Sequence, residues 1–176
     1  MNLCLEDLTA AGRALLLGAL AVAVPAPAWS AGASVADLAG VRGVRVAISQ
    51  TTPDAMSCGI DLRGLLPLVS EGLAQGGLAI DPSAEVTVTL TVLTGYDGAS
   101  GVCASAPMLG AYRQVSFFDE KAGWLRSGQV VLWQRGTASA TASADHAEAV
   151  RQAVASLSEA FLSSWRDANS GGQANR

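Results

Sequence analysis

Residues 85–94 read Glu-Val-Thr-Val-Thr-Leu-Thr-Val-Leu-Thr, and this stretch decides the fold. Apolar residues alternate here with threonines, which is the period of two of a β-strand with one face on the core and one in water. The inward-facing set is Val86, Val88, Leu90 and Val92. A sheet covered on both faces would need apolar side chains at the threonine positions as well. The stretch therefore predicts a two-layer α+β sandwich.

The segment before this strand predicts one more strand and one helix. Residues 44–49 have the same period of two, with large apolar side chains at Val44, Val46 and Ile48 and other residues between them. Between the two strands, an apolar stripe with helical spacing consists of Leu62, Leu66, Val69 and Leu73. Asp61 can cap this helix and Gly76-Gly77 can end it. Pro67 lies inside the pattern, so we expect either a kink there or a helix start near Gly64.

The segment after the strand predicts two more strands and a long helix. We expect a loop rich in Gly, Ser and Ala from Gly95 to Gly110, then strands at 111–119 and 128–142. Asp145 and Glu148 form a capping-box-like start of the last helix. Its apolar stripe is Val150, Val154, Leu157, Phe161 and Trp165. The order β-α-β-β-β-α predicts a mixed four-stranded sheet, with a parallel crossover, an antiparallel meander and two helices on one face.

Length and charge limit the class of protein. The chain has 176 residues, close to the size of one domain, and a formal net charge of −4. The sequence has no cluster of basic residues, which argues against nucleic acid as a partner. We expect a single α+β domain at 31–170 and a disordered tail at 171–176.

The start of the chain predicts a cleaved signal peptide at residues 1–30. Arg13 precedes eleven apolar residues, a run shorter than the roughly 20 that span a membrane. Small residues suit cleavage after Ala28 or after Ser30. Cys4 precedes the apolar run, so a lipid-anchored protein is disfavoured, and the rest of the sequence shows no membrane span. We expect a soluble periplasmic or secreted protein.

Two cysteines, Cys58 and Cys103, remain after the predicted cleavage. An even pair in an oxidising compartment predicts a structural disulfide between them. Their wide spacing suits neither a metal site nor a redox motif. A reactive thiol pair is the alternative interpretation.

The sequence offers few groups for catalysis. His146 is the single histidine and lies at the start of the last predicted helix, where we expect it to be exposed. Nucleophile and phosphate-binding motifs are absent, and the scattered acids do not supply a metal site. Asp97-Gly98 and Asp119-Glu120 are expected to form solvated turns. We predict no catalytic residue, no metal and no cofactor.

Two regions are candidates for contact with a partner or a ligand. Trp124 lies in a predicted hairpin turn, where a tryptophan can contact a partner or fold back over the core. The predicted 95–110 loop carries Tyr96, Asp97 and Met108, and loops of this length are often functional.

Several structural features occur together in this sequence. They are the signal peptide, Cys58 before the first long helix, Cys103 after the 85–94 strand, Leu132-Trp133 in a strand and Phe161-Leu162-x-x-Trp165 in the last helix. This set resembles a group of short exported periplasmic proteins of proteobacteria, whose function is unknown. The topology is also similar to the amino-terminal domain of TolB and to envelope assembly-lipoprotein domains. That similarity implies a role in protein binding without catalytic residues, although the lipid-attachment cysteine of the lipoproteins is missing.

Three functions follow as hypotheses. The first is a non-catalytic accessory protein that binds an envelope partner through its exposed sheet face and strand edges. The second is a carrier of a small molecule or a lipid, with a pocket under the 95–110 loop. The third, which the sequence favours least, is a hydrolase-type enzyme.

Overall fold

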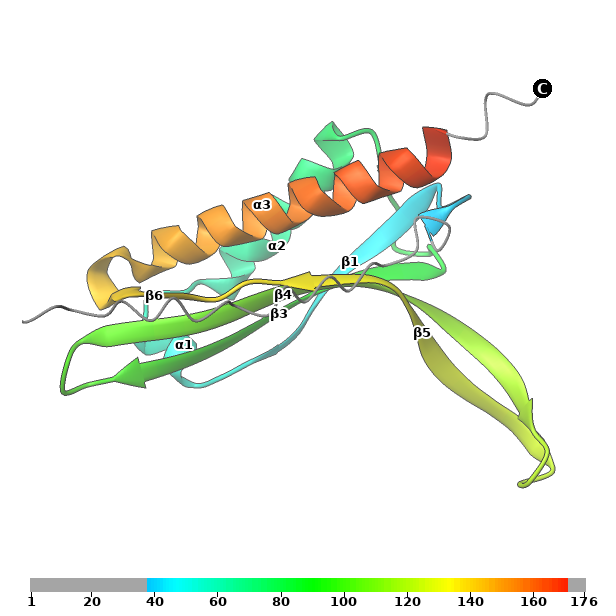
Figure 1. Cartoon of the computed structure of the whole chain (residues 1–176), viewed down its shortest axis with the longest axis horizontal. Helices are drawn as coiled ribbons and strands as arrows, with labels where there is room; N and C mark the ends of the chain where they lie inside the picture. Colours follow the sequence, from blue (N-terminus) through cyan, green and yellow to red (C-terminus); the bar gives the residue numbers. More distant parts are fainter. Residues whose placement is uncertain (1–37, 171–176) are drawn as a thin grey trace, which may run out of the picture. The chain divides into compact units, whose positions relative to one another are not determined.

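A computed structural model of the chain describes residues 38–170 (Figure 1). The predicted signal peptide at 1–30 and the predicted tail at 171–176 lie outside the described residues. The elements in chain order are β1 (Gly43–Thr51), α1 (Asp54–Ser57), α2 (Leu62–Gln75), β2 (Ala79–Ile80), β3 (Val86–Asp97), β4 (Val102–Asp119), β5 (Trp124–Gly136), β6 (Ser139–Ala142) and α3 (Ser143–Ser170).

The strands form one mixed sheet in the order β2-β1-β3-β4-β5, and β6 also pairs with β4. β1 runs parallel to β3, and β3, β4 and β5 form an antiparallel meander, as predicted. The α+β class is confirmed, but the predicted count of four strands is wrong. β2 has two residues and is too short to show any alternation in the sequence. The predicted strand at 128–142 is interrupted after Gly136, so that its second half forms β6.

Both long helices cover the same face of the sheet, as predicted (Figure 1). α2 packs on β1 and β2, α3 packs on β4, β5 and β6, and the two helices pack against each other. The core lies between the helices and the sheet. Its fully buried large side chains include Phe161, Leu73, Leu90 and Leu109.

The deciding strand β3 has the two faces that its sequence predicts. The buried apolar residues are Val86, Val88, Leu90 and Val92, and Thr94 continues this face. On the open face, Thr87 Oγ1 accepts a hydrogen bond from Arg45 Nε at 2.6 Å. Thr91 Oγ1 and Ser49 Oγ also share a hydrogen bond of 2.6 Å. These polar contacts between β3 and β1 make the uncovered face of the sheet compatible with water.

The helix α2 begins as predicted, because Asp61 Oδ1 accepts the backbone N–H of Arg63 at 2.9 Å. Pro67 lies inside the helix and does not delay its start. The buried stripe is Leu65, Val69 and Leu73. The predicted stripe is wrong at Leu66, which is 38% exposed. Leu65 and Leu66 both have helical spacing to the residues that follow, so the sequence pattern does not choose between them.

The predicted loop from Gly95 to Gly110 is wrong. β3 continues to Asp97, a short turn follows, and β4 begins at Val102. Every residue of β3 pairs with a residue of β4, from Val86 opposite Arg113 to Asp97 opposite Val102. The small side chains of this segment give a weak strand signal, and the paired neighbour rather than intrinsic propensity makes it a strand.

The hairpin of β4 and β5 extends beyond the rest of the sheet (Figure 1). The pairing of β4 with β3 ends at Arg113, whereas its pairing with β5 continues to Asp119 opposite Trp124. Gly123 has a φ of 72°, a conformation that other residues rarely adopt, and it closes the turn. We call residues 114–129 the arm.

The helix α3 begins at Ser143, two residues before the predicted Asp145. Near its end, Trp165 Nε1 donates to the carbonyl of Val41 at 2.7 Å, which fixes the helix over the start of β1. Between residues 38 and 170, no helix combines the length and the apolar character that crossing a membrane requires.

Candidate functional site

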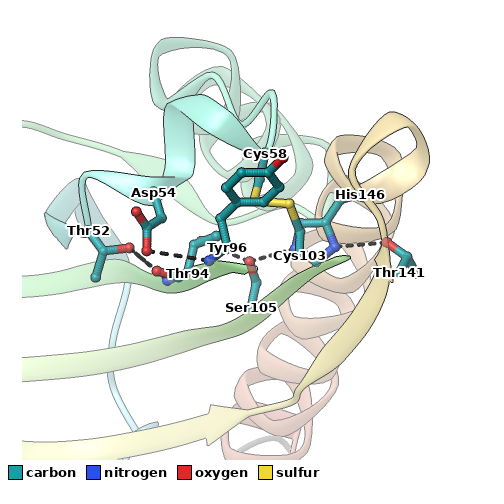
Figure 2. The surroundings of a disulfide bond; sticks show 9 residues. All are labelled: Thr52, Asp54, Cys58, Thr94, Tyr96, Cys103, Ser105, Thr141 and His146. Carbon is teal, nitrogen blue, oxygen red and sulfur yellow. Dashed lines mark hydrogen bonds between the residues drawn. A yellow bond between two sulfur atoms is a disulfide. The ribbon is translucent and has the colours of Figure 1, made fainter. Parts of the chain in front are cut away.

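The predicted disulfide between Cys58 and Cys103 is confirmed (Figure 2). Both cysteines are fully buried, and their Cα atoms are 6.0 Å apart. Cys58 follows α1, before α2, as expected. Cys103 lies in the strand β4 rather than in a loop, because the predicted loop is a strand. A disulfide favours an oxidising compartment.

A chain of buried polar side chains lies beside the disulfide (Figure 2). Thr94 Oγ1 is 2.8 Å from Ser105 Oγ, and Ser105 Oγ is 2.7 Å from His146 Nε2. The other ring nitrogen, Nδ1, is 2.8 Å from Thr141 Oγ1. We call Thr94, Ser105, Thr141 and His146 the polar cluster. It joins β3, β4, β6 and α3.

The expectation that His146 is exposed is wrong, because the side chain is completely buried. α3 begins at Ser143, so His146 lies inside the helix, and its spacing of four residues from Val150 puts it on the buried face. Burial lowers the pKa of His146, because desolvation disfavours the charged imidazolium. A neutral imidazole has one donor and one acceptor nitrogen, and the two neighbouring hydroxyls can satisfy either tautomer.

The contact between Ser105 and His146 has the distance of a nucleophile and its general base. Two features separate it from such a pair. Ser105 is 4% exposed and His146 is 0% exposed, so neither faces a surface that a substrate can reach. A hydroxyl of Thr141, not a carboxylate, meets Nδ1. The arrangement satisfies buried polar groups and connects four elements.

The sequence does not point directly to this cluster, because Ser105 and His146 are far apart in the chain. One signal was available. Cys103 must be buried to bond Cys58, and residues two apart in a strand share a face. Ser105 therefore had to be buried if this segment was a strand, and a buried hydroxyl needs a partner.

The arm is a second site, and its large apolar side chains are exposed on both faces. Residues directly opposite each other share a face in an antiparallel pair. Phe118 is opposite Leu125, and these side chains are 60% and 70% exposed. Phe117 and Trp124 lie on the other face and are 49% and 60% exposed.

Polar contacts hold side chains in place on the face that carries Phe117 and Trp124. Arg126 Nε lies 3.1 Å from Asp119 Oδ2, and the guanidinium lies 5.8 Å from the centre of the Trp124 ring. Asp119 Oδ1 also accepts the backbone N–H groups of Lys121 and Ala122 at 3.0 and 3.1 Å. The expected solvated turn at Asp119-Glu120 is therefore present, and it holds Trp124 in place without covering it.

The four residues predicted as partner or ligand contacts do not come together. Tyr96 and Asp97 lie at one end of the β3–β4 hairpin, where the carboxylate of Asp97 accepts from the hydroxyl of Ser100 in a turn. That hydrogen bond lowers the pKa of Asp97. Met108 lies in the middle of β4 and is half-buried. Trp124 lies in the arm, and about 50 Å of strand length along β4 separates it from Tyr96.

The sequence matches no protein-family model and no curated protein. A variant of the PelC dodecamer from Paraburkholderia phytofirmans has 18% identity over 68% of this chain and 85% of that chain, with a TM-score of 0.40. Another structure of this dodecamer has 16% identity over 68% and 86%, with a TM-score of 0.40. A neuraminyllactose-binding hemagglutinin homolog from Helicobacter pylori has 13% identity over 73% and 84%, with a TM-score of 0.24.

Similarity at this level assigns no family and no function to the chain. The amino-terminal domain of TolB and the assembly-lipoprotein domains are not among these three structures. The resemblance to them stays a prediction.

Proposed function

We propose that this protein is a non-catalytic accessory module of the bacterial envelope that binds a protein partner through the arm. The observation that carries the proposal is the exposure of Phe118, Leu125, Phe117 and Trp124 on two opposite faces of one ribbon. Contiguous exposed apolar surface is typical of interaction sites, and aromatic residues are enriched at their centres.

The strand pairing of the arm supports the same proposal. Beyond Arg113, β4 has no β3 residue beside it, and the outer edge of β5 has no strand partner in the part of the chain that the structure describes. An isolated two-stranded ribbon has marginal stability in water. A partner strand added to either edge would satisfy backbone groups and cover apolar side chains at once. The buried disulfide is consistent with a periplasmic location.

The test is site-specific photocrosslinking in living cells. A photoreactive phenylalanine analogue replaces Phe118 or Leu125, and a control places it at Glu159, which is exposed on α3. We expect the two arm positions, but not the α3 position, to give one reproducible adduct with an envelope protein. Equal adducts at all three positions, or none from the arm, would contradict the proposal.

The other two hypotheses have less support. The carrier hypothesis placed its pocket under a 95–110 loop, and this segment is instead a pair of hydrogen-bonded strands. The hydrolase hypothesis depended on His146 and Asp97, and His146 is completely buried beside Ser105 while Asp97 accepts hydrogen bonds in an exposed turn.

A further inference from the structure

The strand β1 has a free edge on the side away from β3. β2 covers only Gly43 and Val44, and the last backbone bond on this side runs from Asp81 N to the Val44 carbonyl at 2.9 Å. Alternate residues of a strand direct their backbone groups to the same edge. The N–H and C=O groups of Val46 and Ile48 therefore point to an edge that has no strand partner among residues 38–170.

The helix α2 forms a wall along this free edge, so that the edge lies in a groove. One depression of about 350 Å³ is lined by Val46, Leu66 and Ile80, among others. A second, of about 430 Å³, lies between Ile48, Leu62 and the same Leu66. Leu66 and Ile80 are 38% and 39% exposed, so the floor and wall of the groove offer apolar surface to an occupant. This explains why Leu66 departs from the buried stripe of α2.

The charge of the groove is opposite to that of the chain. Arg45 lines the first depression and Arg63 the second, and neither lining contains an acidic residue. Neither arginine takes part in a salt bridge within the described residues. The chain as a whole has a net charge of −4. The groove therefore favours an occupant that carries carboxylates.

We propose that this groove binds an extended peptide whose side chains are alternately apolar and acidic, and which adds to the sheet as a strand beside β1. On an added strand, alternate side chains face α2 or the open face of the sheet. Those facing α2 fill the apolar depressions beside Leu66. Those facing the open face lie on the side of Arg45, where a carboxylate forms a favourable cross-strand pair.

The observations favour such a peptide over a second copy of this chain. Two copies paired through this edge would bring four arginines, Arg45 and Arg63 from each, into one groove, and like charges at close range oppose pairing. This site is separate from the arm, so the inference does not depend on the proposed function.

The experiment uses the full chain and a fluorescein-labelled peptide of alternating Glu and Val, and it measures fluorescence anisotropy at neutral pH. The reference peptide alternates Lys and Val. We expect saturable binding of the Glu peptide only. Leu66→Asp weakens it about tenfold or more, because the charge enters the apolar wall. Leu125→Asp, the same change in the arm, leaves the affinity unchanged.

A charge reversal tests the role of the arginines. The double variant Arg45→Glu, Arg63→Glu is expected to lose the Glu peptide and to bind the Lys peptide. Circular dichroism checks that each variant is folded. Crosslinking from Phe118 should be unaffected by Leu66→Asp, so that this inference and the proposed function fail or survive separately.

Three binding results would overturn the inference. They are no saturable binding of the Glu peptide by the full chain, equal binding of both peptides, and binding that is insensitive to Leu66→Asp. Sedimentation velocity supplies a fourth. A dimer that Leu66→Asp dissociates would assign the groove to a second copy of the chain.

Discussion

The buried His146 imidazole makes the stability of the fold depend on pH in a window that no other side chain shares. Burial lowers its pKa below the ordinary value of 6.5, so the folded protein binds this proton less readily than the unfolded chain. As pH falls below 6.5, the unfolded chain takes up the proton more fully than the folded protein does. Stability therefore falls as pH falls. The sequence contains a single histidine, so this effect belongs to one residue.

The expected magnitude follows from one proton. The slope of the unfolding free energy cannot exceed about 1.4 kcal/mol per pH unit for a single site. Between pH 7.5 and 5.5 the loss is up to about 1.4 kcal/mol, since the unfolded chain is half-protonated near 6.5. Hydrogen bonds lower the pKa values of Asp81, Asp97 and Glu148. The stability that these carboxylates contribute is therefore lost only at a more acidic pH, where they become protonated.

Urea unfolding followed by tryptophan fluorescence at several pH values between 7.5 and 5.5 measures this loss. His146→Gln has no titrating imidazole and should give an unfolding free energy that is constant over the same range. NMR titration of the imidazole in the unmodified protein is a direct second measurement, and the midpoint should lie below 6.5. A midpoint at or above 6.5, or an undiminished pH dependence in His146→Gln, would refute the reasoning.

Other predictions concern the disulfide and the core. Replacing both Cys58 and Cys103 by Ala should lower the unfolding free energy by up to about 4 kcal/mol, because the unfolded chain regains the freedom of the loop that the bond closes. Urea unfolding of the variant checks this, and a loss below about 0.5 kcal/mol would contradict it. Leu90→Ala should cost about 2–5 kcal/mol, since Leu90 is fully buried. Leu93→Ala, at a half-exposed site on the same strand, should change stability by less than about 0.5 kcal/mol, and similar losses in both variants would show that the assigned faces of β3 are wrong.

The sequence was sufficient to predict elements whose polarity pattern is long and regular. The alternation in residues 85–94 gave β3 and its two faces, and the pairing of Cys58 with Cys103 followed from their number. The polarity pattern does not predict a strand where the side chains are small. The segment Gly95–Gly110 consists largely of Ala, Ser and Gly, and it becomes a strand because β3 lies beside it, which is information that no local window contains.

The candidate sites were less predictable than the fold for related reasons. The sequence predicts an exposed His146 because it lies at the helix start, yet His146 precedes Val150 by four residues, and this spacing puts both on the same buried face of α3. Trp124 was recognised as a candidate, but the arm was not. The exposure of Phe118 depends on where β3 ends, and only the register of the whole sheet fixes that point.

The strand β4 connects the arm to the disulfide in one unbroken segment, and this has a mechanical consequence. A force that a partner applies to the arm is transmitted along β4 to its ladder with β3, and the component of the force along the strand loads the hydrogen bonds of this ladder together in shear. Near the far end of that ladder, Cys103 is bonded covalently to Cys58. A pull on the arm that displaced β4 would therefore be stopped by a covalent anchor, and reduction of this bond should lower the force at which the domain yields.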